Sequence, residues 1–210
     1  MDPIDLLADD AVDVAPLLLG AVLAVRDPRA PDAQTVAVRL TEVEAYGGAE
    51  DPGSHAYTGR TPRNASMFEA GGILYVYFTY GMHHCANIVC GPAGRASAVL
   101  LRAGEVVAGG ETARSRRPAA RRDADLARGP GRLCAALGLT RADDGARLGR
   151  AGSRASLVLP DEPVPPGLVR TGPRTGVSGL GGDGTAFPRR FWIDSDPTVS
   201  PYRPARRRRG

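Results

Sequence analysis

The hydrophobic and polar positions of this chain alternate over several short segments, and side chains two apart in an extended segment share one face. Aromatic and β-branched residues fill these segments, and glycine, proline and polar residues bound them, as is typical of β-strands. The pattern predicts four main strands at 35–46, 72–80, 84–91 and 95–106, and two short ones near 156–160 and 189–194. Gly81 and Met82 stand between the second and third strands, where they indicate a turn.

Helical spacing of apolar residues occurs in two other places. VDVAPLLLGAVLAV (12–25) is expected to open the fold as one helix, and GPGRLCAALGL (129–139) to form another. The segment 108–122 is expected to be helical at first and then flexible. Strands in succession, with helices at intervals, predict an α/β domain of the α+β type that is built on an antiparallel sheet with flanking helices.

The length of 210 residues fits one domain, and a chain of that size can bury roughly 70% of its unfolded surface. We expect residues 1–202 to form this domain and residues 203–210 to be a basic, disordered tail. No apolar run reaches about 18 residues, and the first residues are acidic where a signal peptide is basic, so we expect a cytoplasmic protein without membrane contact. The three cysteines lack paired spacing and are expected to be reduced thiols: Cys85, Cys90 and Cys134.

The net charge of +4 comes from the terminal run Arg206–Arg209, and without that run the charges of the chain balance. A second basic block occupies 113–122. Both blocks are expected to be poorly packed and solvated, or else to contact phosphate groups non-specifically. The chain contains no lysine, which excludes a Walker-type phosphate loop and a lysine Schiff base from its chemistry.

The strand predicted at 35–46 contains two candidate catalytic carboxylates. Simple alternation places both on one face, which carries Val36, Val38, Leu40, Glu42, Glu44 and Tyr46. Such diagonal neighbours lie about 7 Å apart, and their repulsion in a partly buried cleft would raise the pKa of at least one carboxyl group. A carboxyl group of that kind can act as a general acid or base, although a solvated strand end is the plainer explanation. The long polar loop that follows favours a cleft.

The second and third predicted strands concentrate aromatic and histidine side chains. Simple alternation places Tyr75, Tyr77 and Thr79 on one face. Core packing explains part of this pattern, but a turn that shows tyrosine, methionine and histidine to water is typical of a binding surface. A zinc site is an alternative for His83, His84, Cys85 and Cys90, but neighbouring histidines on a strand point to opposite faces and the spacing matches no common zinc site.

Several motifs in order resemble the mammalian-type 3-methyladenine (alkyladenine) DNA glycosylases. They are EVEAY (42–46), RTPRNASMF (60–68), ILYVYFTYGMHHCANIV (73–89), AVLLRAGEV (98–106), GPGRLCAALGL (129–139), RTGVS (174–178) and RRFWIDSDPTVS (189–200). The resemblance extends over nearly the whole chain. It implies a monofunctional enzyme that flips a damaged purine out of double-stranded DNA and hydrolyses its N-glycosidic bond without a cofactor or metal. It also implies a single compact domain around a curved antiparallel sheet. For this chemistry we expect a monomer.

The resemblance further implies roles for individual residues. Glu44 matches the general base that activates water, and Arg102 matches an arginine that positions this water. The groups that hold the flipped base match Tyr46, His55, Tyr77 and Asn87, of which Asn87 disfavours guanine. The wedge that fills the vacated place in the duplex matches Tyr80, with Met82 and His83 beside it.

The sequence departs from the family pattern in two places. His83 and His84 stand where relatives often carry bulky aromatic residues, and Arg128 and Arg132 stand where asparagine and lysine are common. Both arginines keep or add positive charge at the start of a predicted helix, where a phosphate group can bind. A domain of the same fold that binds nucleic acid without catalysis is the alternative to a glycosylase. The retained Glu44 argues against it, because a carboxylate weakens binding to phosphate.

Overall fold

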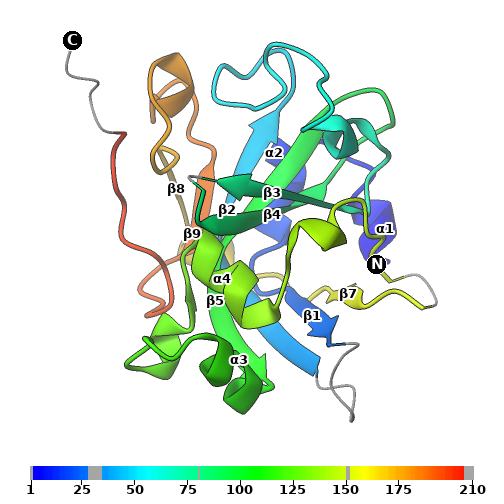
Figure 1. Cartoon of the computed structure of the whole chain (residues 1–210). Coiled ribbons are helices and arrows are strands. Elements are labelled where there is room, and N and C mark those ends of the chain that lie inside the picture. Colours follow the sequence, from blue (N-terminus) through cyan, green and yellow to red (C-terminus); the bar gives the residue numbers. More distant parts are fainter. Residues whose placement is uncertain (1, 28–34, 80, 150–151, 206–210) are drawn as a thin grey trace.

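The structure is a computed structural model, and it describes residues 2–27, 35–79, 81–149 and 152–205. Within these ranges nine strands form one open sheet, in which each pairing is antiparallel (Figure 1). The strands are β1 (Val22–Arg26), β2 (Thr35–Gly47), β3 (Leu74–Thr79), β4 (His83–Val89), β5 (Ser97–Ala108), β6 (Ala127–Arg128), β7 (Ala155–Val158), β8 (Val169–Gly172) and β9 (Arg190–Ile193). The main order is β3-β4-β5-β2-β1-β7; β6 pairs with β5, and β9 pairs with both β2 and β8.

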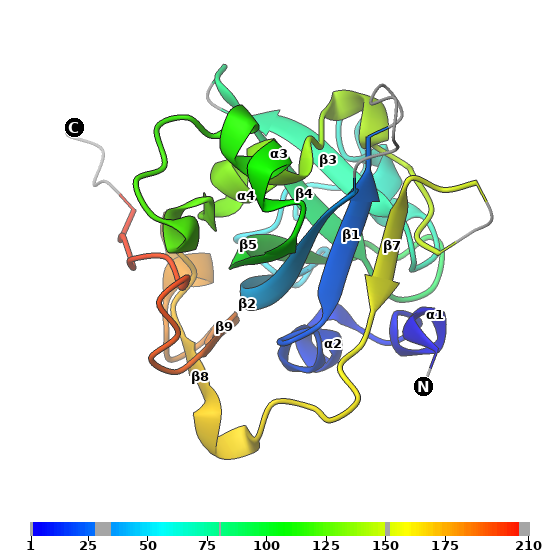
Figure 2. The same cartoon turned by 90° about the horizontal axis from the view of Figure 1, so that it is seen from below.

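Helices flank this sheet (Figure 2). The α-helices are α1 (Pro3–Leu6), α2 (Ala11–Leu17), α3 (Gly110–Arg116) and α4 (Pro130–Leu137). Short 3-10 turns are η1 (Ala65–Phe68), η2 (Asp123–Asp125), η3 (Arg141–Asp143), η4 (Pro166–Leu168) and η5 (Leu180–Gly182). The predicted α+β fold on an antiparallel sheet is confirmed. None of the described helices has the length and apolar character needed to cross a membrane.

The expectation of one helix over 12–25 is wrong. Helix α2 ends at Leu17, and the chain turns at Gly20, whose φ of 84° favours glycine. The residues that follow form β1, which pairs with β2 on one side and with β7 on the other. A short apolar run fits a helix or a strand equally well, so pairing partners far along the chain decide between them.

Two of the three register shifts between β2 and β5 bear on which side chains of β2 face the core. One shift leaves Thr41 as an extra residue on β2, and the next leaves Arg102 as an extra residue on β5. The side chains of β2 in the main core are therefore Val36, Val38, Leu40, Val43 and Ala45. The predicted single face from Val36 to Tyr46 is wrong, because the extra residue puts Glu44 and Tyr46 on the opposite side from Leu40.

The sheet separates a large core from a smaller one. Helices α2, α3 and α4 pack into the large core together with side chains from β1, β2, β4 and β5. On β3, Leu74 and Val76 point into this core, whereas Tyr75 and Tyr77 pack on the other side with Met67. The predicted face of Tyr75 and Tyr77 is thus confirmed.

The basic block at 113–122 is partly packed through Ala113, Arg116 and Arg117, so the expectation of a poorly packed segment is wrong for its first half. Ala113 is fully buried in the large core. Arg116 forms an ion pair with Asp27 at 2.6 Å and donates to the carbonyl oxygen of Ala136 at 3.0 Å. Arg117 donates to the carbonyl oxygen of Leu126 at 3.2 Å. The terminal run Arg206–Arg209 lies outside the described residues.

Candidate active site

A cavity of about 1070 Å³ lies on the face of the sheet that is turned away from the large core. Its walls come from β2, β3, β4 and β5, from the loop at 52–55, from the turn at 175–178 and from residues between 117 and 135. Six residues that the sequence predicts for the site line this cavity: Tyr46, His55, Tyr77, His83, Asn87 and Arg102. The fold therefore gathers side chains that are widely separated along the chain.

Glu44 is fully buried directly behind the wall of this cavity. Three lining residues contact its carboxylate: the Tyr46 hydroxyl donates to Oε2 at 2.8 Å, the Thr175 backbone N–H donates to Oε1 at 2.6 Å, and Arg102 Nη1 lies 3.2 Å from Oε1. Burial and the charge of Glu44 raise the pKa of Tyr46 well above its usual value. The phenol therefore stays protonated and remains a donor to Glu44.

The second carboxylate of β2, Glu42, has a different environment. It is fully buried and accepts hydrogen bonds from Arg102 Nε at 2.8 Å, from Arg190 Nε at 2.7 Å and from the Ser200 backbone N–H at 2.7 Å. Burial acts to raise the pKa of Glu42, but the charges of Arg102 and Arg190 outweigh it and the pKa is lowered. The expectation that repulsion raises a carboxyl pKa is therefore wrong for Glu42, because two arginines neutralise the pair.

Tyr46 is supported from behind by a buried arginine. The guanidinium carbon of Arg174 lies 4.4 Å from the centre of the Tyr46 ring, within range of a cation–π contact. Arg174 and Asp51 are both fully buried, and each of the two Nη atoms of Arg174 lies 2.6 Å from an Asp51 oxygen. One face of the Tyr46 ring is therefore covered by a rigid ion pair.

Aromatic rings form a second wall of the cavity. The rings of Tyr75 and Tyr77 stack with their centres 5.4 Å apart, and the His55 ring meets Tyr77 edge-on at 4.7 Å. The Tyr75 hydroxyl is 3.4 Å from His55 Nδ1. Burial, and then the charge of Arg63, lower the pKa of His55, so its imidazole is neutral near neutral pH. His55 therefore offers the cavity an uncharged ring.

Asn87 lies in the buried part of the cavity wall. Its side-chain Nδ2 donates to the backbone oxygen of Tyr75 across the β3–β4 pair at 3.1 Å. This bond holds the amide in one orientation, so a bound ring meets a polar group at a defined position.

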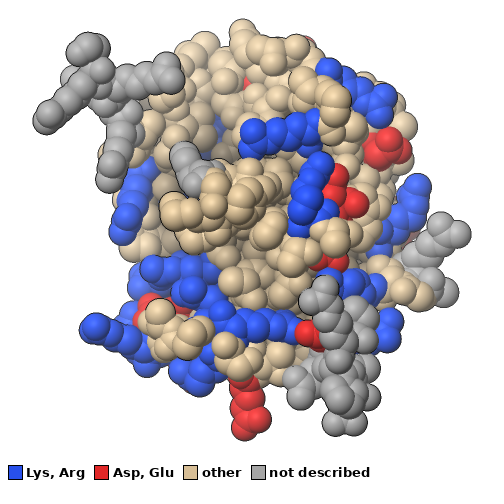
Figure 3. All heavy atoms as spheres, in the orientation of Figure 1, with Lys and Arg blue, Asp and Glu red and all other residues tan. Residues whose placement is uncertain are grey.

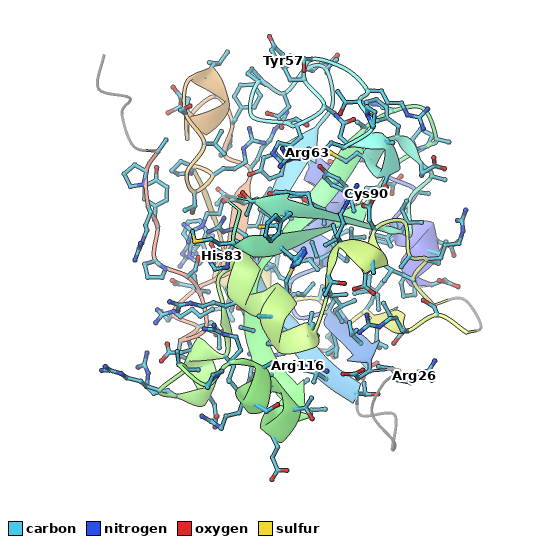
Figure 4. The ribbon with its side chains drawn as sticks, viewed as in Figure 1. Arg26, Tyr57, Arg63, His83, Cys90 and Arg116 are labelled. Carbon is cyan, nitrogen blue, oxygen red and sulfur yellow. The ribbon has the colours of Figure 1, made fainter. Side chains whose placement is uncertain are left out.

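Met82 and His83, just before and at the start of β4, differ in their position relative to the cavity. Met82 is 69% exposed and does not line the cavity, whereas His83 does and packs closely against Gly131 at the start of α4. Figure 4 shows His83 at the start of β4 beside α4. Tyr80 lies outside the described residues.

His83 and His84, the adjacent histidines considered as zinc ligands, point to opposite sides of β4. His83 faces the cavity, whereas the His84 ring packs against Phe78 on the opposite side at 5.0 Å. His83 and Cys90 lie toward opposite ends of β4 (Figure 4). In the described part of the chain no three His, Cys, Asp or Glu side chains are placed to hold a metal ion.

Arginines line one end of the cavity. Arg117, Arg121 and Arg132 come from the segment after α3 and from the first turn of α4. Arginine side chains also gather around α3 and the segment after it on the outer surface (Figure 3). Asp125 lines the cavity as well, but the three arginines outnumber it, so this end of the cavity is suited to an anionic ligand.

Several residues of the site were not singled out from the sequence. They are Arg174, Thr175, Arg190 and Ser200, which contact Glu42, Glu44 or Tyr46, and Asp51, which pairs with Arg174. The motifs RTGVS and RRFWIDSDPTVS contain four of them, so the signal was in the resemblance. The Thr175 Oγ1 atom is buried without a hydrogen-bond partner among the described residues.

Comparison with known proteins gives consistent matches over this chain. A family model described as methylpurine-DNA glycosylase matches residues 5–197. A provisionally named 3-methyladenine DNA glycosylase of Streptomyces avermitilis is 57% identical over 207 residues, which cover 97% of this chain and 94% of the relative. Proteins with the same provisional name are 54% identical in Leifsonia xyli subsp. xyli and 51% in Nocardia farcinica. Those two matches cover 95% and 94% of this chain and 91% and 89% of the relatives.

Proposed function

This chain belongs to the methylpurine-DNA glycosylase family, as the resemblance of its motifs indicated, and we propose that it removes alkylated or deaminated purines of the 3-methyladenine type from double-stranded DNA. The observation that carries the proposal is the buried Glu44 carboxylate, held by Tyr46, Arg102 and Thr175 directly behind a cavity with aromatic walls. A domain that only binds DNA does not need a carboxylate at this position, because binding requires no group that takes a proton from water.

In the proposed reaction, Glu44 accepts a proton from a water molecule. The water oxygen forms a bond to C1′ of the sugar while the bond between C1′ and the purine nitrogen breaks. Positive charge develops on the sugar in the transition state, and the nearby carboxylate stabilises it. Arg102, which is 3.2 Å from Glu44, orients the water. The purine leaves with the electron pair of the broken bond: an alkylated, cationic purine departs neutral, whereas a neutral lesion such as hypoxanthine also takes up a proton from solvent. An abasic site remains.

The cavity walls suit a purine that has been flipped out of the duplex. A flipped base is held by stacking on aromatic side chains and by hydrogen bonds to its edges. Tyr46, His55 and Tyr77 supply these surfaces, and Asn87 disfavours guanine by meeting its exocyclic amino group. An alkylated purine carries a positive charge, so it needs less help to leave than a neutral base does.

The turn after β3 and the arginine end of the cavity suit the surrounding DNA. A side chain inserted at a turn can fill the place that the flipped nucleotide leaves, as wedge residues do in minor-groove binding proteins. We assign this role to Tyr80, with Met82 and His83 beside it. Arg117 and Arg132 at the cavity end are suited to DNA phosphates.

The remaining properties follow from this chemistry. Without lysine the chain has no side-chain amine for a Schiff base, so the enzyme is monofunctional and does not cleave the strand. The reaction needs no cofactor. We expect a monomer in the cytoplasm, in contact with the nucleoid if the source is bacterial.

The test is single-turnover excision from end-labelled duplexes that carry one hypoxanthine or one ethenoadenine, together with release of methylated bases from alkylated DNA. We expect strand breaks only after alkali, and none with Glu44→Gln, which should still bind the lesion. Glu105→Gln, at an exposed carboxylate on β5, is the matched control and should keep full activity. Release of no base by the wild type, with lesion DNA still bound, would support the binding domain instead.

A further inference from the structure

We propose that Glu42 is a positioning residue, which fixes the orientation of Arg102 beside Glu44 with the help of Arg190 and Ser200. This inference rests on the proposed function, because it assigns the second carboxylate of β2 to the support of the same reaction. Glu42 does not line the cavity, so it acts on substrate only through Arg102.

Each nitrogen of the Arg102 guanidinium has its own partner. Nε donates to Glu42 Oε1 at 2.8 Å, Nη1 lies 3.2 Å from Glu44 Oε1, and Nη2 donates to the Ser200 hydroxyl at 3.3 Å. A guanidinium group forms its strongest contact when two of its nitrogens face both oxygens of one carboxylate. Glu42 occupies Nε, so Arg102 touches Glu44 through one nitrogen only.

This division of partners matters for the carboxylate that takes the proton. A paired, two-nitrogen contact with Arg102 would cover both oxygens of Glu44 and hold the arginine away from the water. With Glu42 in place, Glu44 Oε2 accepts one hydrogen bond from the residues that the structure describes, from the Tyr46 hydroxyl. Both carboxylates are fully buried and Arg102 and Arg190 are nearly so, and the four charges cancel.

Arg190 and Ser200 hold Glu42 from the other side. Arg190 Nε donates to Glu42 Oε1 at 2.7 Å, and its Nη2 donates to the Ser200 carbonyl oxygen at 3.0 Å. The Ser200 backbone N–H donates to Glu42 Oε2 at 2.7 Å. The guanidinium carbon of Arg190 also lies 4.4 Å from the Trp192 ring, which fixes it on β9. The segment before the C-terminus is therefore part of the support for Arg102.

Two variants test this role and one serves as control. Glu42→Gln removes the charge that holds Nε, and Ser200→Ala removes only the hydroxyl that holds Nη2 while all charges stay. Asp143→Asn is the matched control, since Asp143 is buried and paired with Arg154 at 2.6 Å but lies outside the cavity lining. Each variant is compared with the wild type for thermal unfolding, lesion-duplex Kd and single-turnover rate. The reaction is also run with methanol present, and the fraction of the sugar product that carries methanol in place of water is measured.

We expect Glu42→Gln to lower the single-turnover rate about 100-fold with little change in Kd, because misplacement by about 1 Å has this effect on a reacting group. Ser200→Ala should lower the rate about fivefold, as loss of one weak hydrogen bond does. Both should raise the methanol share, because the site holds water less selectively, and Asp143→Asn should leave rate and share unchanged. If Glu42→Gln does not fold, Ser200→Ala decides the question.

Wild-type rates and methanol shares in both variants would overturn the positioning role. The positioning role would also be overturned if Asp143→Asn slowed the reaction too, and if the loss of rate in all three variants followed their loss of stability. Failure of the proposed function looks different, since the wild type would then release no damaged base from any substrate.

Discussion

Replacement of Arg174 by methionine is expected to destabilise the protein strongly. Arg174 and Asp51 are both fully buried, and Arg174 also donates to the carbonyl oxygens of Ala45 at 2.9 Å and Gly181 at 2.7 Å. Methionine fills similar space but leaves the Asp51 carboxylate without its main partner. The loop that follows β2 and the turn that carries Thr175 would lose their common anchor.

The size of the effect follows from the burial of the pair. Removal of one partner from a buried ion pair costs about 3–5 kcal/mol. Arg189 Nη1 stays 3.1 Å from Asp51, so we expect the lower end, about 3 kcal/mol. In a chain of this length each kcal/mol lowers the Tm by about 2–4 °C, so the expected loss is roughly 6–12 °C.

The assay is thermal unfolding by calorimetry, with Arg170→Met as the control. Arg170 pairs with Asp194 at 2.7 Å, but the two side chains are 47% and 38% exposed, and such surface pairs contribute about 0–1 kcal/mol. If Arg174→Met lowers the Tm no more than Arg170→Met does, the buried pair does not stabilise the fold and our reasoning is refuted.

Other changes have smaller or more local effects. Tyr46→Phe removes the hydrogen bond to Glu44 and should slow single-turnover excision about tenfold, as a bond to a charged group is worth about 1.5 kcal/mol; an unchanged rate would argue against that bond. Tyr80→Ala should weaken binding to lesion duplex in a mobility-shift assay, and unchanged affinity would count against the wedge. Deletion of Arg206–Arg209 should weaken DNA binding at low salt and leave excision intact; loss of lesion preference would contradict this. Burial acts to raise the pKa of Glu42, but two arginines lower it below its unfolded value of about 4. The ionised Glu42 therefore stabilises the fold fully above about pH 4, and this contribution is lost as the pH falls through the folded pKa. The Tm should therefore drop steeply below about pH 4, and Glu42→Gln should flatten that drop.

The elements that the sequence predicted well are those with a strong local pattern. Strands β2, β3, β4 and β5 and helix α4 follow from alternation or helical spacing, and their bounds in the structure agree closely. The prediction of one helix over 12–25 was wrong, because its apolar residues satisfy both periods and the outcome depended on pairing with β2 and β7. The sequence thus predicted a helix or strand correctly only where its apolar residues followed the helical or the strand period and not both.

Amino-acid types and motifs were enough to name the chemical groups of the site. The carboxylate at Glu44, the aromatic residues around Tyr77 and the arginine at Arg102 are all visible in the sequence, and the lack of lysine limits the chemistry directly. These conclusions depend on which groups are present and in what order, and need no knowledge of distance.

Distances and faces were decided by the folded chain alone. A register shift at Thr41 turns Glu44 to the cavity side, and no alternation pattern reveals an extra residue in one strand. Glu42 and Glu44 are two residues apart in the sequence. Only Glu42 is bonded to Arg190 and Ser200, which lie about 150 residues further along the chain. The role of a buried carboxylate depends on the charges within a few ångströms of it, and the chain sets these only by folding.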